Sequence, residues 1–187
     1  MKKDRLAIFD LDGTLFDTAP ANFAAYQHAL HNHGFSLDEE TFFKRCNGRY
    51  YKDFLPPIIG RDEQLLEIIH KEKTASYPQY FHRMRENRAL FDLLDTLRPV
   101  YHTALVTTAS KPSVMAILDC FNKRDKFDLI LTQQDVVHKK PAPDGFLMAM
   151  QHFDIPAEKT IIFEDSDEGI AAARACGAAY FLVQEIL

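Results

Sequence analysis

Four short polar segments of this sequence carry side chains that could do chemistry together. They are Asp10-Leu11-Asp12-Gly13-Thr14, Thr107-Thr108, Lys139-Lys140-Pro141 and Glu164-Asp165-Ser166-Asp167. Three of them directly follow an apolar run that is typical of a buried strand, and the lysine segment precedes a helix-like segment. Because reactive side chains of an open parallel sheet gather beyond the carboxyl ends of its strands, we expect all four segments to meet in one crevice.

The residue types in these segments fit phosphoryl transfer. Several carboxylates in one crevice repel each other unless a hard cation neutralises them, and oxygen ligands of this kind suit Mg²⁺. With that cation and a lysine present, a phosphate dianion can approach a carboxylate, so we expect Asp10 to attack phosphorus and form an aspartyl-phosphate. Asp12 could protonate the leaving alcohol and later take a proton from water, with Thr14 holding it in place. Thr107 and Lys140 would bind the non-bridging phosphoryl oxygens.

Each pattern taken singly also has an ordinary structural explanation. Asp-x-Asp-Gly occurs more often as a turn than as a catalytic motif. A threonine at a strand end and a surface lysine are common, and the pair Glu164-Asp165 could simply complement the dipole of a following helix. Their order at successive strand ends favours the catalytic interpretation.

Five apolar runs predict the strands that position these segments, at residues 6–9, 103–107, 129–131, 160–163 and 180–183. Helical segments separate the last four, with Ser110, Asp144 and Ser166 or Asp167 as expected N-caps and Gly177 as an expected stop. The alternation predicts an α/β fold with a doubly wound, mostly parallel, Rossmann-like sheet.

A long stretch between the first two strands is too long for one crossover. Its apolar residues recur at helical spacing in segments 19–32, 37–46, 62–76 and 79–97. We predict an inserted helical domain over residues 16–83, and a core formed by residues 1–15 and 84–187. The last helix of the stretch is expected to belong to the core.

Composition narrows the class of protein. The chain has 187 residues, of which 47% are hydrophobic and 26% charged, with a net charge of -5. This balance argues against a surface for nucleic acid or for an anionic membrane. The cysteines are odd in number and widely spaced, and the first residues lack the apolar run of a signal peptide. We therefore expect free thiols and a cytoplasmic protein.

The runs FDLDGTLFDT, ALVTTAS, KKPAPDGF and IIFEDSDEGIAAARACG resemble the four motifs of the haloacid dehalogenase superfamily. The resemblance covers the chain nearly end to end. It implies that Asp10 is the nucleophile, Asp12 the general acid and base, and Thr107 and Lys140 the phosphoryl binders. It also implies that Asp165 binds Mg²⁺ together with Asp10 and the backbone carbonyl of Asp12.

Two further residues follow from the same resemblance. Glu164 looks like the additional acid of family members with Glu-Asp-Ser in the last motif, acting as a metal ligand or behind one. Thr108 immediately follows Thr107, so the placement of the second motif stays open by one residue and Thr108 is a candidate for substrate binding.

The insertion resembles the helical C1 cap of the superfamily, which closes over the crevice and selects the substrate. DTAPAN resembles phosphoglycolate phosphatases, and FEDSDEG resembles sugar-phosphate phosphatases and beta-phosphoglucomutase. We therefore expect a phosphomonoester hydrolase acting on a small phosphorylated metabolite, either phosphoglycolate or a sugar phosphate. Arg49 and Lys52 are candidates to bind a carboxylate or second phosphate of the substrate.

Two alternatives remain open. A phosphosugar mutase uses the same site, but its cap loop would read Gly-x-x-Arg, whereas this chain has Asn47-Gly48-Arg49. A catalytically inactive binding or scaffold protein could share the fold, and loss of the acidic residues would be its signature. The sequence retains those residues, and it predicts no oligomeric state.

Overall fold

The computed structural model describes residues 3–184. The chain through Asp17 and from Arg85 onward forms one compact unit, and Thr18–Met84 forms a second. In the first unit, five parallel strands form a single sheet in the order β5-β4-β1-β6-β7. Their bounds are β1 Arg5–Phe9, β4 Tyr101–Val106, β5 Leu129–Leu131, β6 Thr160–Glu164 and β7 Ala179–Leu182.

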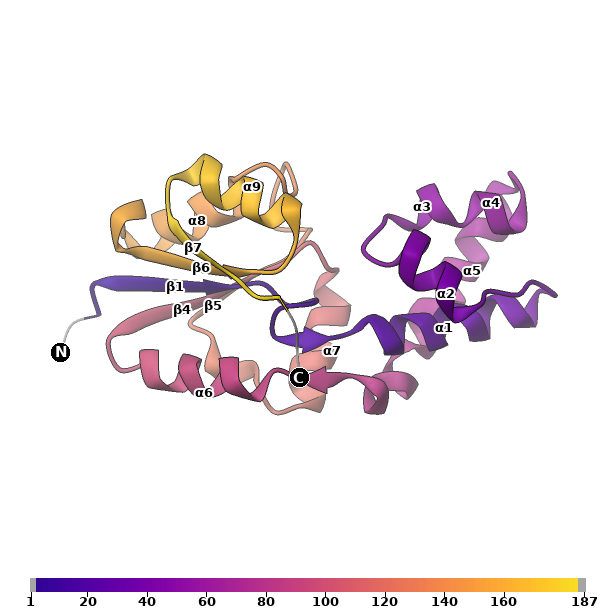
Figure 1. Cartoon of the computed structure of the whole chain (residues 1–187), viewed down its shortest axis with the longest axis horizontal. Coiled ribbons are helices and arrows are strands. Elements are labelled where there is room, and N and C mark those ends of the chain that lie inside the picture. The colour runs from indigo at the N-terminus through magenta and orange to yellow at the C-terminus, as the bar shows by residue number, and fades with distance from the viewer. Residues whose placement is uncertain (1–2, 185–187) are drawn as a thin grey trace. The chain divides into compact units, whose positions relative to one another are not determined.

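The three central strands are apolar and buried because helices cover both faces of the sheet. Figure 1 shows α8 (Asp144–Phe153) and α9 (Asp167–Cys176) on one face, and α6 (Arg88–Leu97) and α7 (Lys111–Cys120) on the other. Short 3₁₀ turns at Arg124–Lys126 and Ala157–Lys159 lead into β5 and β6. The structure confirms the predicted doubly wound α/β sheet.

Local signals place the ends of these helices, with one correction. Ser166 is the N-cap of α9 and accepts a hydrogen bond from the Gly169 N–H, and Gly177 ends the helix in the left-handed conformation at φ 77°. Asp144 was expected to cap α8 but is its first residue, because Pro143 occupies the N-cap position. The carboxylate of Asp144 bonds instead to His138.

The second unit is helical and has its own core. It contains α1 Ala19–Asn32, α2 Glu39–Thr41, a π-helical turn Phe42–Cys46, α3 Tyr51–Phe54, α4 Pro56–Ile59, α5 Glu63–Ser76 and a 3₁₀ turn Tyr77–Arg83. Its core is a cluster that includes Phe42, Leu55 and Ile69, each at most 2% exposed. Asp62 caps α5 by accepting from the Leu65 N–H, at the start of the segment predicted as helical.

The expected helix over residues 79–97 is wrong. The 3₁₀ turn gives way to extended backbone at Met84 (ψ 150°), and Asn87 caps a new helix, α6, by accepting from the Leu90 N–H. Between them, β3 (Arg85–Glu86) pairs antiparallel with β2 (Phe16–Asp17). The segments that enter and leave the helical unit are therefore joined as a short ribbon within the first unit.

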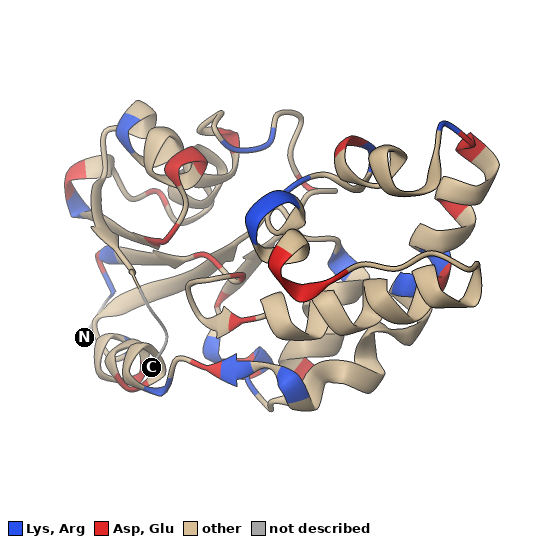
Figure 2. Cartoon of the chain, turned by 45° about the vertical axis from the view of Figure 1, so that its right-hand side comes forward, with Lys and Arg blue, Asp and Glu red and all other residues tan. Residues whose placement is uncertain are grey.

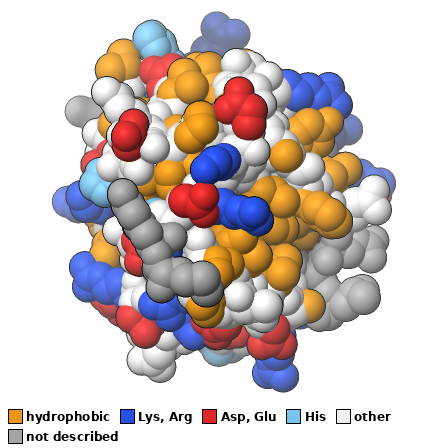
Figure 3. All heavy atoms as spheres, turned by 90° about the vertical axis from the view of Figure 1, so that its left-hand side faces the viewer, with side chains coloured by type: hydrophobic (Ala, Val, Ile, Leu, Met, Phe, Trp, Pro, Cys, Tyr) orange, Lys and Arg blue, Asp and Glu red, His pale blue; other side chains and the backbone are white. Residues whose placement is uncertain are grey.

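Charged side chains are spread over the surface. On the face shown in Figure 3, lysines and arginines are interspersed with acidic and hydrophobic side chains. Neither sign of charge forms a continuous patch on this face. Within residues 3–184, no helix has the length and apolar character needed to cross a membrane.

Candidate active site

The residues predicted to form the site lie at the carboxyl ends of the central strands. Asp10 follows β1, and its N–H donates to the Phe163 carbonyl at 3.0 Å. Thr107 follows β4, and its N–H donates to the Leu131 carbonyl at 3.0 Å. Glu164 is the last residue of β6. Figure 2 shows acidic positions where the central strands end. Because the strands are parallel and in register, these side chains emerge at one edge of the sheet.

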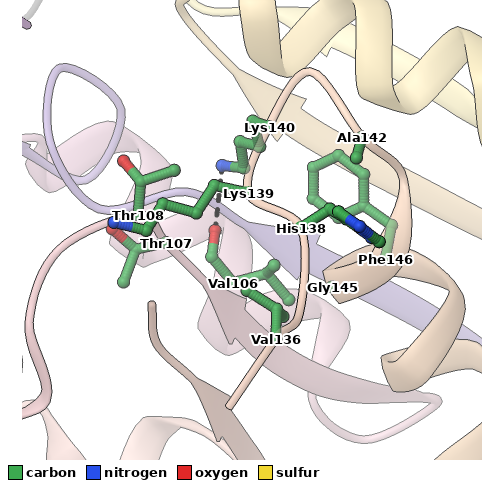
Figure 4. A pocket seen from close by; sticks show the side chains of 10 residues that line it. All are labelled: Val106, Thr107, Thr108, Val136, His138, Lys139, Lys140, Ala142, Gly145 and Phe146. Carbon is green, nitrogen blue, oxygen red and sulfur yellow. Dashed lines mark hydrogen bonds between the residues drawn. The ribbon is translucent and has the colours of Figure 1, made fainter. Parts of the chain in front are cut away.

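Lys140 lies at the centre of this edge with its side chain only 8% exposed. Its Nζ donates to Asp10 Oδ1 at 2.6 Å, to the Val106 carbonyl at 3.0 Å and to Glu164 Oε1. Figure 4 shows this side chain reaching the Val106 carbonyl beside Thr107 and Thr108. The structure thus brings the lysine motif into direct contact with the first and fourth motifs.

Glu164 is fully buried, and both oxygens of its carboxylate accept hydrogen bonds. Besides Lys140 at Oε1, its Oε2 accepts from Asp165 N–H at 3.1 Å, Ser166 N–H at 3.2 Å and Ser166 Oγ at 3.0 Å. A buried carboxylate held in this way stays fixed in position. The start of α9 is therefore built around the Glu164 carboxyl group.

Gly169 makes this arrangement possible, and the sequence interpretation gave it no role. A Cβ at this position would lie 2.0 Å from the carboxyl carbon of Glu164. The sequence does indicate a special role for this residue, because a glycine stands three residues after a capping serine, where most helices carry a better helix former.

Gly13 and Thr14 fit closely against Asp165. Thr14 Oγ1 donates to Asp165 Oδ1 at 2.8 Å, which corrects the expectation that this hydroxyl holds Asp12. Gly13 adopts φ +86°, and a Cβ there would lie 2.1 Å from Asp165 Oδ2. The glycine is needed both for the turn and for the approach of the carboxylate.

Asp12 lies half-buried in the tight turn that follows β1. Its backbone forms an isolated β-bridge with that of Phe16, and the Gly13 N–H donates to the Phe16 carbonyl at 2.8 Å. Its charge is one of those that raise the pKa of Asp10. The two aspartates therefore interact electrostatically.

Burial dominates the protonation of the site. It raises the pKa of Asp10 well above its usual range, against the attraction of Lys140, and it raises the pKa of Asp165 to about 6. Burial also opposes the charge on Lys140, but Asp10 and Glu164 outweigh it and raise the lysine pKa. The ammonium is therefore charged, whereas burial disfavours the ionised forms of Asp10 and Asp165.

These acids fit a divalent cation. Asp10, Glu164 and Asp165 each offer a carboxylate oxygen, and the three lie within 4.8 Å of one another. Hard oxygen donors of this kind suit Mg²⁺, which completes its shell with water. A cation here would favour the ionised carboxylates that burial disfavours. The Asp12 side chain does not belong to this cluster.

Thr107 and Thr108 differ in their surroundings. Thr107 is 5% exposed, and its hydroxyl oxygen accepts from the Ala109 N–H at 3.1 Å, which leaves its own proton available to donate. Thr108 is exposed. Both line a cavity of about 10 Å³ with Lys140, enough for about one water molecule.

Arg49 and Lys52 belong to the helical unit, and both are exposed. The Lys52 ammonium pairs with Glu67 Oε1 at 2.7 Å, and the Tyr51 hydroxyl donates to the same carboxylate at 3.2 Å. The charge of Lys52 is therefore partly neutralised within its own unit.

Comparison with known proteins gives a consistent result. The family model of haloacid dehalogenase-like hydrolases matches residues 7–183. The chain is 30% identical to fructose-1-phosphate phosphatase YqaB of Escherichia coli, over 91% of each chain. It is 27% identical to the phosphorylated carbohydrates phosphatase of Thermotoga maritima, over 91% of this chain and 80% of the relative.

A solved structure agrees with this assignment. That of CbbY from Rhodobacter sphaeroides in complex with phosphate matches with a TM-score of 0.82 and 25% identity. The match covers 96% of this chain and 86% of that one. The sheet order, the four motifs and these relatives agree, and the chain belongs to the haloacid dehalogenase-like hydrolase family.

Proposed function

We propose that this protein is a Mg²⁺-dependent phosphomonoester hydrolase that acts on a small sugar phosphate through an aspartyl-phosphate on Asp10. The contact that carries the proposal is the buried ion pair between Lys140 and Asp10, with 2.6 Å between Nζ and Oδ1. A lysine buried beside a carboxylate at the mouth of a parallel sheet can hold a phosphate dianion next to a nucleophile of the same charge.

Binding would use the donors around this pair. Lys140 and Thr107 line the same cavity, and the ammonium and the hydroxyl can both donate to non-bridging phosphoryl oxygens. We favour Thr107 over Thr108 because its buried hydroxyl is fixed by the bond it accepts from Ala109. Fixed donors cost less reorganisation when charge develops on the transferred group.

The reaction would proceed in two displacements. An Asp10 carboxylate oxygen attacks phosphorus, the bond from phosphorus to the alcohol oxygen breaks, and Asp12 gives its proton to that oxygen. A water molecule then attacks phosphorus and gives a proton to Asp12, and the bond from phosphorus to Asp10 breaks. Inorganic phosphate leaves, and both aspartates return to their starting states.

Asp10, Asp165, Glu164 and the backbone carbonyl of Asp12 are the proposed ligands of Mg²⁺. When bound, the cation supplies charge neutralisation for the phosphate and favours the ionised form of Asp10. Glu164 would also keep Lys140 in place, because it contacts the ammonium directly.

The helical unit is proposed to act as a cap that recognises the substrate. The ribbon of β2 and β3 supports this, since it joins the entering and leaving segments at a point that directly follows Asp10 and Asp12 in the chain. Arg49 is a better candidate than Lys52 for contact with the substrate, because Lys52 already pairs with Glu67. We therefore propose the helical unit Thr18–Met84 as the cap and the first unit as the catalytic core, which moves the boundaries expected from the sequence, 16–83, by up to two residues.

Sugar phosphates are favoured over phosphoglycolate by the relatives. The Escherichia coli relative is named for fructose 1-phosphate, and that of Thermotoga maritima for phosphorylated carbohydrates. Both align over most of this chain, including the helical unit that the proposal makes responsible for selection. A small sugar phosphate is therefore the expected substrate class.

The test is a substrate panel with Mg²⁺: fructose 1-phosphate, other hexose phosphates, phosphoglycolate and p-nitrophenyl phosphate. Asp10→Asn should release no phosphate. Asp4→Asn is the matched control, because Asp4 precedes the other end of β1 and pairs with Lys159 on the surface, so it should behave as wild type.

Three results would contradict parts of the proposal. Preference for phosphoglycolate would overturn the substrate class. Isomerised hexose phosphate without phosphate release would identify a mutase. No turnover of any compound, by wild type and Asp10→Asn alike, would favour a catalytically inactive binding protein.

A further inference from the structure

Residues 132–143 connect β5 to α8 and carry Lys140 in a loop that two carboxylates brace. At its start, Asp135 Oδ2 accepts from Thr132 N–H at 2.9 Å and from Thr132 Oγ1 at 2.7 Å. At its end, Asp144 Oδ2 accepts from His138 N–H at 3.1 Å and from His138 Nδ1 at 3.0 Å. Each carboxylate accepts two hydrogen bonds, so we call each pair of bonds a brace. Only the brace between His138 and Asp144 has Lys140 in the segment that it closes.

The Asp144 brace closes the segment from His138 to Asp144 on itself. Asp144 is also the first residue of α8, so it ties the loop directly to a helix that packs on the sheet. The hydrogen bond from His138 lowers the pKa of Asp144, which keeps the acceptor ionised. Lys140 therefore lies in a segment that is closed by hydrogen bonds and anchored to the start of α8.

The two residues of α8 that follow Asp144 pack close to the groups around Lys140. Gly145 lets the helix approach β4 closely, since a Cβ there would lie 2.7 Å from Val106 Cγ1. Phe146 is 1% exposed, and its ring centroid lies 5.2 Å from Lys140 Nζ. Val106 also provides the carbonyl that accepts from Lys140. Figure 4 shows Gly145, Phe146 and Val106 lining the same cavity as the lysine.

We propose that Asp144 is a positioning residue that holds Lys140 against Asp10 by closing the loop from His138 onto the first turn of α8. The inference rests on the proposed function, in which Lys140 binds the transferred phosphoryl group. It extends that function to a residue that contacts neither the proposed nucleophile nor the proposed metal ligands. A displacement of about 1 Å in a catalytic group can cost up to about 100-fold in rate.

The test compares Asp144→Ala with Asp135→Ala, which removes the matched brace from the same loop. Asp144→Ala should lower kcat for the best substrate of the panel by about 10- to 100-fold. Asp135→Ala should change kcat by less than about threefold, even if it lowers the melting temperature as much or more, because Thr132 is fully buried. Equal losses of kcat, or full activity of Asp144→Ala, would overturn the proposal.

A conservative variant separates the acceptor from the charge. Asn at position 144 keeps an oxygen that can accept from the His138 N–H, so Asp144→Asn should recover most of kcat. His138→Ala should lose less than Asp144→Ala, because it keeps the backbone donor. An asparagine variant as impaired as the alanine variant would contradict a positioning role for this bond.

A measurement without substrate makes the proposal independent of turnover. A buried ammonium held by three acceptors exchanges slowly with water and should give its own ¹H–¹⁵N NMR signal, assigned by its loss in Lys140→Met. Asp144→Ala should broaden or shift this signal and Asp135→Ala should leave it in place; an unchanged signal in Asp144→Ala would refute the positioning role. If wild type hydrolyses no phosphate ester, the proposed function fails while this spectrum still decides the role of Asp144.

Discussion

Replacing Gly169 by alanine tests whether the Glu164 carboxylate is held as the structure places it. An alanine Cβ would lie 2.0 Å from the carboxyl carbon and 2.1 Å from both oxygens. Glu164 is fully buried and Gly169 is buried in the first turn of α9, so neither can move into open solvent. The substitution must displace either the carboxylate or the start of the helix.

Two opposing effects set the size of the change. Alanine is the better helix former, which favours the variant by about 1 kcal/mol. Displacing Glu164 weakens hydrogen bonds to a buried charge, each worth about 1.5–3 kcal/mol, from donors that include Lys140 and Ser166. With partial relaxation, we expect the free energy of unfolding to fall by about 2–4 kcal/mol, so the clash outweighs the gain in helix propensity.

Urea unfolding of the metal-free protein measures this change, and steady-state kinetics should show a loss of kcat. Glu168→Ala is the matched control, because Glu168 is the exposed neighbour in the same turn and its replacement should change stability by less than about 0.5 kcal/mol. A Gly169→Ala protein that is as stable as wild type and retains full kcat would refute the reasoning about Glu164.

Three further predictions concern charge in the site. Burial raises the pKa of Asp165 from 3.8 to about 6, so between these values the metal-free folded state keeps a proton that the unfolded chain has lost. The protonated carboxyl group stabilises the folded state fully below about pH 4, and this contribution to stability is lost as pH rises through about 6. Asp165→Asn should therefore raise the metal-free free energy of unfolding at about pH 8 by about 1–2 kcal/mol in urea titrations, with no gain near pH 4. Mg²⁺ at about 100 times its dissociation constant should stabilise wild type by about 2.7 kcal/mol in thermal melts and should not stabilise Asp165→Asn. Lys140→Met leaves two buried carboxylates without their counter-ion and should cost about 3 kcal/mol in EDTA; a variant as stable as wild type would show that the ion pairs are not formed.

Short-range patterns predicted much of the fold. Apolar runs located the strands because a sheet covered on both faces requires them. Ser166 marked the start of α9 and Gly177 its end, as their residue types indicate. The helical period over residues 79–97 failed because it could not reveal the pairing of β3 with β2, which depends on residues far earlier in the chain. Tertiary pairing overrode local propensity there.

Contacts within the site were less predictable. The sequence predicted which residue types gather at the strand ends, but the partner of Thr14 lies 151 positions away and only the folded chain selects it. Close approaches have the same origin, since Gly13 and Gly169 are needed because particular carboxylates pack against them. Asp144 resembled an N-cap by sequence, whereas Pro143 takes that position and frees its carboxylate for His138.

The most direct test of the account is to trap the covalent intermediate. The protein would be mixed with its best substrate and Mg²⁺, quenched during turnover, reduced with borohydride and digested for mass spectrometry. Reduction of an aspartyl-phosphate gives homoserine, which we predict at position 10, only when substrate and Mg²⁺ are both present. Turnover of substrate without modification at Asp10, or with modification at another residue, would contradict the account.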